Sequence, residues 1–201
     1  MARNIKILLI VFLAFIGSQS FCQLLDSSQL SITYEFRTLE EAMQNPDSVF
    51  ILTLKKQKIE SFPEEIFMFK NIQKLDLRKN KIQLIPRNIE QLQKLEYLNI
   101  SKNKLETIPP EIGKLKNLKD LIIFQNEITY LPSEIGEAEN LEFLDMWGNE
   151  LESLPDEISK LKNLVILDLR VIEISNDKQK QFQQLLPNTK IYFSNSCNCG
   201  G

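Results

Sequence analysis

Histidine is missing from all 201 residues of this chain, and its absence removes several kinds of active site. Without imidazole there is no Ser-His-Asp triad, no Cys-His pair and no histidine ligand for a metal ion. Glycine is scarce as well: its six positions form neither a GxGxxG nor a GxxxxGK loop, so the usual phosphate-binding loops are absent. We therefore expect no cofactor and no metal site.

A strong charge of either sign is also lacking. The chain has 24 Lys and Arg against 27 Asp and Glu, which gives a formal net charge of −3. Loss of a leader containing Arg3 and Lys6 would leave 22 basic against 27 acidic residues, a net charge near −5. A weakly acidic chain has no general attraction for nucleic acid or anionic lipid, so nucleic acid is an unlikely partner.

Residues 1–22 have the pattern of a secretory signal peptide. A short cationic start precedes the apolar run 7–16, and Ser20 and Cys22 supply small residues just ahead of Gln23, where cleavage would fall. The run is too short to span a bilayer, so we expect no transmembrane segment after cleavage. Lipid attachment at Cys22 is the less favoured alternative, because Phe21 stands where a lipoprotein signal has a small residue. The expected location is the periplasm, the cell surface or the medium.

A repeat of 23 residues organises most of the remaining chain. Five units fill residues 49–163, among them LEYLNISKNKLETIPPEIGKLKN at 95–117, and a sixth begins at Leu164 before departing from the pattern. Prolines recur at an unbroken spacing of 23 at Pro63, Pro86, Pro109, Pro132 and Pro155, and asparagines do so at Asn80, Asn103, Asn126 and Asn149. Self-similarity at such a period predicts a solenoid in which each coil stacks on its neighbours.

This unit resembles the LxxLxLxxNxLxxLPxxIxxLxx repeat of the leucine-rich repeat family, and it is similar to that of exported bacterial members. The resemblance implies an α/β repeat solenoid: a curved parallel sheet on the concave wall, an irregular or short helical convex side, and a cap at each end. It further implies that the four asparagines form a structural ladder between coils. In this family the concave wall is also where partners are usually held.

The residues themselves support this organisation. In each LxL segment the side chains alternate, so Leu75 and Leu77 point to the core and the residues between them point away. We assign residues 23–48 to an N-terminal segment and cap, with Thr38 and Glu41 as a helix-capping box, and residues 49–174 to the repeats.

Residues 175–201 form the predicted C-terminal cap. We expect a helix that begins near Ser175 and stops before Pro187, then a strand at residues 190–194. The tail contains Cys197 and Cys199. A disulfide between residues so close would close a strained loop, and two thiols supply only half of a usual zinc shell, so we expect a mobile tail.

Positions that face away from the core carry an unusual apolar cluster. Trp147, the only tryptophan, lies outside the apolar template of the repeat and is predicted to face solvent beside Phe124, one coil away. Such a cluster is a marker of an interaction surface, although the rings could instead cover one another or lie under the C-terminal tail. The predicted partner-binding residues are Tyr97, Ile122, Phe124, Phe143, Trp147 and Arg170.

Two charged groups lie on the same predicted wall. The first is a basic patch that could seat an acidic peptide, an anionic glycan or, less favoured, nucleic acid, or could simply keep an edge soluble. Its members are Lys55, Lys56, Arg78, Lys79 and Lys102. The second is the adjacent pair Asp145 and Asp168, the only paired carboxylates worth weighing for glycosidase chemistry. An open wall admits water freely, so we expect no enzyme activity.

The sequence thus predicts an exported, non-catalytic leucine-rich repeat protein that binds a protein or peptide through its concave wall. Two alternatives stay open. A glycan-binding module would use the same aromatic residues as stacking platforms for sugar rings, and a structural spacer would have no specific site. The repeat spacing does not identify the partner.

Overall fold

The computed structural model describes residues 24–194, and within them the chain divides into two units at Ile32. The described part of the first unit contains α2 (Ser27–Ile32). The Asp26 carboxylate begins this helix by accepting the N–H groups of Ser28 and Gln29, each at 2.9 Å. The second unit, from Thr33 onward, contains all the repeats. The predicted signal peptide and the three cysteines lie outside the described residues.

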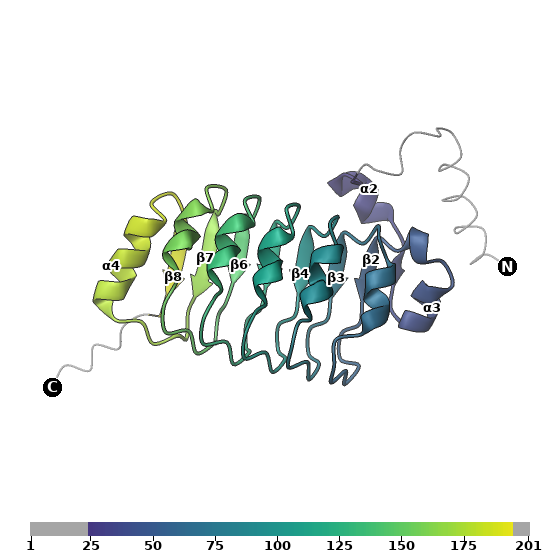
Figure 1. Ribbon diagram of the computed structural model, residues 1–201, viewed down its shortest axis with the longest axis horizontal. Helices are drawn as coiled ribbons and strands as arrows, with labels where there is room; N and C mark the ends of the chain where they lie inside the picture. The colour runs from purple at the N-terminus through teal and green to yellow at the C-terminus, as the bar shows by residue number, and fades with distance from the viewer. Residues whose placement is uncertain (1–23, 195–201) are drawn as a thin grey trace. The chain divides into compact units, whose positions relative to one another are not determined.

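A single open sheet of eight parallel strands forms one wall of the stacked coils, with the strands in sequence order (Figure 1). The strands are β1 (Glu35–Phe36), β2 (Ile51–Thr53), β3 (Lys74–Asp76), β4 (Tyr97–Asn99), β5 (Asp120–Ile122), β6 (Phe143–Asp145), β7 (Ile166–Leu169) and β8 (Lys190–Phe193). Between β2 and β7 the register advances by one repeat per strand, so Leu75, Leu98, Leu121 and Leu144 lie side by side and point to the core. The predicted leucine-rich repeat solenoid is confirmed.

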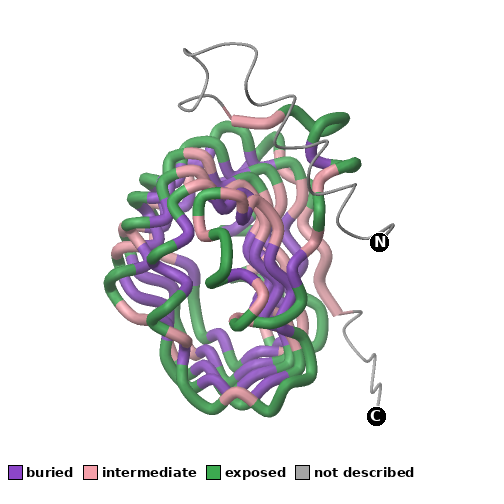
Figure 2. The backbone as a smooth tube through the Cα atoms, turned by 90° about the vertical axis from the view of Figure 1, so that its right-hand side faces the viewer, coloured by how far each residue is buried: buried purple, intermediate pink, exposed green. Residues whose placement is uncertain are grey.

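Short 3₁₀ helices form the opposite wall. They are η2 (Glu64–Met68), η3 (Arg87–Gln91), η4 (Pro110–Lys114), η5 (Ser133–Glu137) and η6 (Asp156–Lys160). A further short 3₁₀ helix, η1 (Pro46–Ser48), packs against α3 in the N-terminal cap. The five repeated prolines precede η2 to η6, and the carbonyl of each accepts the N–H of the isoleucine three residues later, as from Ile89 to Pro86 at 3.0 Å. The fixed φ of proline suits this start. Figure 2 shows buried segments on both walls, and the apolar core lies between them.

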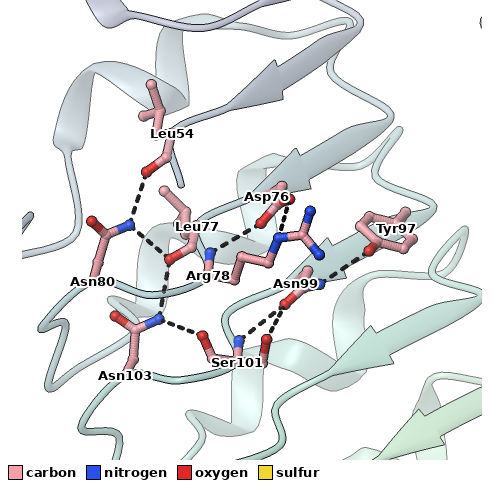
Figure 3. Close-up of polar contacts among 9 residues, drawn as sticks. All are labelled: Leu54, Asp76, Leu77, Arg78, Asn80, Tyr97, Asn99, Ser101 and Asn103. Atoms are coloured by element: carbon pink, nitrogen blue, oxygen red, sulfur yellow. Dashed lines mark hydrogen bonds and ion pairs between the residues drawn. The ribbon is translucent and has the colours of Figure 1, made fainter. Parts of the chain in front are cut away.

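The asparagine ladder lies inside the coils. Asn80, Asn103, Asn126 and Asn149 are each less than a tenth exposed. The Asn103 side-chain nitrogen donates to the carbonyl of Leu77 in the preceding coil at 3.1 Å (Figure 3). It also donates to the carbonyl of Ile100 at 3.0 Å, and the side-chain oxygen accepts the N–H of Ile82. The other three repeat this arrangement. The ladder therefore satisfies backbone groups that have no strand partner.

A second asparagine column, which the repeat pattern did not lead us to expect, joins the coils at the end of each repeat unit. Its side-chain nitrogens donate at 2.7–2.9 Å to carbonyls 24 residues earlier. The donors are Asn71, Asn117, Asn140 and Asn163. In the second 23-residue repeat Lys94 occupies this column, and its ammonium donates to the Asn71 side-chain oxygen at 2.8 Å. The recurrence of asparagine at the last position of four of the five units is the sequence signal for this column.

One prediction about the sheet face needs correction. The basic patch includes Lys56, Lys79 and Lys102, which occupy the seventh position after each unit start and are predicted to lie on the wall itself. In the structure this position forms the turn after the strand, with φ between 51° and 67° in all six coils. Only Gly148 adopts this left-handed conformation without steric cost, and Val171, which is β-branched, is the most strained.

Caps close both ends of the repeats. The helix α3 (Leu39–Met43) begins after Thr38, whose hydroxyl accepts the N–H of Glu41 at 3.2 Å. The Glu41 carboxylate accepts the Tyr34 hydroxyl. At the other end α4 (Asn176–Leu185) begins after Ser175 and buries Phe182, and β8 pairs with β7. The predicted C-terminal helix and strand are therefore present.

We expect Asn126→Ala to lower the free energy of unfolding by about 1–3 kcal/mol, because it leaves buried backbone groups without partners. Urea unfolding of the purified chain measures this change. Asn140→Ala is the matched control, because Asn140 is exposed and its hydrogen bond to the Lys116 carbonyl lies at the surface. An equal loss of stability from both substitutions would contradict the role of the buried ladder.

Candidate functional site

The outer sheet face consists of the side chains that point away from the core, in three rows across the strands. The first row contains Tyr97, Asp120, Phe143 and Ile166, and the second contains Asn99, Ile122, Asp145 and Asp168. The third row follows the strand ends and contains Ser101, Phe124, Trp147 and Arg170. Backbone hydrogen bonds between coils, such as Gln125 N–H to the Trp147 carbonyl at 2.7 Å, hold this third row in place.

Burial on this face is greater than the sequence predicts. Asn99 and Asp168 in the second row are buried, and Ser101 in the third row has no exposed surface. Figure 3 shows why: the Asn99 oxygen accepts both the hydroxyl and the N–H of Ser101, while its nitrogen donates to the Tyr97 hydroxyl. Because strands lie only about 4.8 Å apart, neighbouring side chains cover the middle of the wall. The expectation of an open wall with free access to water is therefore wrong for these positions.

Trp147 lies outside the core and contacts Phe124, its predicted neighbour. Their ring centroids are 5.6 Å apart and the ring planes are inclined by 58°. Both side chains are half-buried, not fully exposed, because each ring covers part of the other. The rings thus form one apolar platform whose remaining surface faces outward.

A shallow pocket of about 330 Å³ opens beside this platform. It is lined by Phe124, Asp145, Trp147, Asp168 and Arg170. Three of the six predicted binding residues therefore come together, whereas Tyr97, Ile122 and Phe143 are half-buried on the same face and do not line the pocket. The sequence indicated the two aspartates only as a possible catalytic pair. Their spacing did not predict that they line a binding pocket.

Asp168 and Arg170 form an ion pair on one side of the pocket. The Arg170 Nε lies 3.0 and 3.1 Å from the two carboxylate oxygens, and Nη2 lies 2.6 Å from Oδ2. The guanidinium also lies 5.6 Å from the ring centroid of Tyr192. Because both Asp168 oxygens are bonded, the pair of aspartates does not supply the two free carboxyls that a glycosidase uses.

Asp145 has a different environment. Its Oδ1 accepts the Trp147 N–H at 3.1 Å, and no ion pair to it occurs within residues 24–194. Burial raises the pKa of the Asp145 carboxyl above its ordinary value, and the negative charge of Asp168 adds to this shift. The Trp147 N–H and the positive charge of Arg170 oppose it without cancelling it. The Asp145 carboxyl therefore binds its proton more tightly than an aspartate in water does.

The predicted basic patch is only partly free. Lys55, Lys56, Lys79 and Lys102 are exposed, and the positive charges of Lys56 and Lys102 lower the pKa of Lys79, which places the three close together. Arg78 is instead paired with Asp76, with its Nε 3.0 Å from Oδ2. The Lys102 ammonium lies 5.6 Å from the Phe124 ring centroid, so the basic patch adjoins the aromatic platform.

Metal-binding clusters are absent from the described part of the chain: no group of three or more Cys, Asp, Glu or His side chains there could hold an ion. The groups with which the charged pocket could contact a partner are an aromatic surface, one ion pair and one carboxylate.

Comparison with known proteins agrees with this architecture. A family model for the leucine-rich repeat region matches residues 51–127, and a leucine-rich repeat model matches residues 140–161. The chain is similar to a solved leucine-rich repeat protein of Leptospira interrogans, with 34% identity, a TM-score of 0.64, and coverage of 81% of this chain and 48% of that one. No match was found among curated proteins.

Two further solved structures share the fold. The leucine-rich repeat ectodomain of the plant membrane receptor kinase GASSHO1/SCHENGEN3 from Arabidopsis thaliana, in complex with Casparian Strip Integrity Factor 2, is 26% identical, with a TM-score of 0.60 and coverage of 77% of this chain and 19% of that one. The functional domain of InlJ from Listeria monocytogenes is 21% identical, with a TM-score of 0.60 and coverage of 79% and 32%. The chain spans about half the length of the Leptospira protein and less of the other two.

The repeats, the sheet and these matches show that the chain is a leucine-rich repeat protein. Leucine-rich repeat domains are in general binding scaffolds for protein partners, not enzymes, and their stacked coils present extended surfaces to those partners.

We expect Leu144→Ala to lower the free energy of unfolding by about 2–5 kcal/mol, because Leu144 is fully buried and its loss leaves a cavity. Trp147→Ala should cost about 1 kcal/mol or less, because the half-buried ring packs mainly on the similarly half-buried ring of Phe124. Urea unfolding of both variants against wild type measures the difference. Equal losses would show that Trp147 belongs to the core.

The raised pKa of Asp145 predicts a specific pH dependence of stability. The folded chain holds this proton more tightly than the unfolded chain, so the stabilising contribution is fully present below the unfolded pKa of about 4 and is lost as pH rises through the folded pKa. Asp145→Asn removes the titrating group and can still accept the Trp147 N–H. Its melting temperature should exceed that of wild type at pH 7, and the difference should shrink toward pH 4; a constant difference across that range would contradict the assignment.

Proposed function

We propose that this chain binds a protein or peptide through its outer sheet face, with the pocket between Phe124, Trp147 and Arg170 at the centre of contact. The observation that carries the proposal is the half-exposed Phe124–Trp147 platform beside a charged pocket. Trp and Arg are the residues that most often dominate binding energy at protein interfaces. An aromatic platform rimmed by charges has the composition of such an interface.

Comparison among the coils supports this role for Trp147. The equivalent position is occupied by Lys55, Arg78, Ser101 and Arg170 in four of the other coils and by Phe124 in the fifth, and each coil forms a strand followed by a turn. The fold therefore does not require a large aromatic residue there. A structural spacer would have no use for a half-exposed tryptophan, which favours binding over that alternative.

The basic patch of Lys55, Lys56, Lys79 and Lys102 extends the proposed surface toward the N-terminal coils. It reaches the platform through Lys102, which lies over Phe124. A partner that covers both regions would meet lysines at one end and the pocket at the other. The plant ectodomain that resembles this chain was likewise solved in complex with a partner, which is in keeping with a binding role.

We further propose that the chain acts outside the cytoplasm. Residues 1–22 have the cationic start, apolar run and small-residue exit of a signal peptide. No helix within residues 24–194 is long and apolar enough to cross a membrane. On this proposal the exported chain begins at Gln23, and a lipid on Cys22 is the alternative that mass measurement of the exported protein would reveal.

The test compares the wild-type chain with the Phe124→Ala/Trp147→Ala double variant in pull-downs from the native envelope and medium. We expect the double variant to lose a partner that the wild type retains, because its contact platform is gone. Tyr130→Ala is the matched control, since Tyr130 is an exposed aromatic residue outside the outer sheet face. All three proteins must melt normally.

Equal recovery of every partner by wild type and double variant would contradict the proposed site. Titration of the wild-type chain with cell-wall oligosaccharides, followed through Trp147 fluorescence, tests the glycan alternative separately. A saturable change with a glycan, together with an empty pull-down, would replace the protein partner by a sugar at the same platform.

A further inference from the structure

An ion pair recurs on the outer sheet face, and one coil lacks its cation. In the second repeat unit Asp76 pairs with Arg78, and at the C-terminal end Asp168 pairs with Arg170. In both pairs the aspartate Oδ1 also accepts the backbone N–H of its arginine, at 3.0 and 3.1 Å. The Asp-x-Arg segment thus binds its own guanidinium.

Asp145 has the same backbone arrangement without the arginine. Its Oδ1 accepts the Trp147 N–H at 3.1 Å, which holds the carboxylate as in the other two coils. The residue two positions on is Trp147, so an indole ring stands where the Asp-x-Arg segment has a guanidinium. Across residues 24–194 no lysine or arginine forms an ion pair with Asp145.

The surroundings leave the pocket with one uncompensated negative charge. Asp168, which lies next to Asp145 in the sheet register, already pairs with Arg170, so that guanidinium is shared at most weakly with Asp145. Lys102, on the far side of Phe124, lies over that ring. A half-buried carboxylate without a cation is costly, and an opposite charge brought to it by a partner would relieve that cost.

We propose that a partner inserts a cationic side chain, an arginine guanidinium or a lysine ammonium, into this pocket, where it pairs with Asp145 and stacks on Trp147. The proposal rests on the proposed function and names the chemistry of the partner group. The incoming cation supplies the positive charge that Arg78 and Arg170 supply in their own coils. Arginine is favoured over lysine, because its planar guanidinium both stacks on an aromatic ring and forks onto a carboxylate.

The chain contains a single tryptophan, so its fluorescence reports on this pocket alone. The probes are blocked five-residue peptides Gly-Ser-Xaa-Ser-Gly, in which Xaa is arginine, lysine or the neutral arginine isostere citrulline. We expect the full chain to bind the arginine peptide most tightly and the citrulline peptide about tenfold or more weakly, which corresponds to about 1.4 kcal/mol.

Two variants test the site directly. Asp145→Asn keeps the shape and the Trp147 bond but removes the charge, so the preference for arginine over citrulline should disappear. Trp147→Arg rebuilds the Asp-x-Arg segment, so the new guanidinium should pair with Asp145 and the variant should no longer bind the arginine peptide. Because this variant lacks tryptophan, NMR shifts of the Gly148 amide measure its peptide binding. Asp76→Asn is the matched control outside the pocket and should keep the preference. Melting curves establish that each variant is folded.

Equal binding of the arginine and citrulline peptides, binding of neither, or an unchanged preference in Asp145→Asn would overturn the inference. The pull-down separates this failure from that of the proposed function. A partner lost with Phe124→Ala/Trp147→Ala but kept by Asp145→Asn would support the binding face and contradict the pairing of a partner cation with Asp145. A partner kept by the double variant would overturn the proposed function itself.

Discussion

The hydrogen bonding of one buried asparagine in each of four successive coils is the constraint on which the rest of this structure depends. After three residues of strand each coil must turn, and its carbonyl and N–H groups then face the interior without a sheet partner. The amides of Asn80, Asn103, Asn126 and Asn149 bond those groups within their own coil and in the preceding one. Because unpaired buried backbone groups are costly, this bonding fixes the turn, the stacking distance and the strand register together.

Such stacking separates structural from functional positions. The inward leucines and isoleucines and the asparagines recur from coil to coil, whereas positions on the outer sheet face vary from Lys to Arg, Ser, Phe and Trp at one equivalent site. Substitutions there alter the surface with little effect on the coil. With Trp147 at the position that holds arginine in two other coils, the face gains an aromatic pocket and Asp145 lacks the cation that Asp76 and Asp168 possess.

The fold and the platform could be predicted because they follow from spacing. A period of 23 placed the strands, the prolines and the buried asparagines, and it put Phe124 beside Trp147. The pocket could not be predicted in the same way. The pairing of Asp168 with Arg170 depends on side-chain rotamers, and the burial of Asn99 and Ser101 depends on hydrogen bonds across the face. The 23-residue period predicts neither the ion pair nor the burial of these two polar side chains.

The sequence by itself determined the solenoid, the direction in which each strand residue points and the identity of the aromatic residues on the outer sheet face. A repeat determines these because every coil meets the same neighbours, so local pattern and tertiary contact coincide. Tertiary structure alone decided which charges are neutralised and how deeply each is buried, because both depend on distances of a few ångströms between side chains from different coils. The difference between paired Asp168 and unpaired Asp145, adjacent in one row, is of that kind.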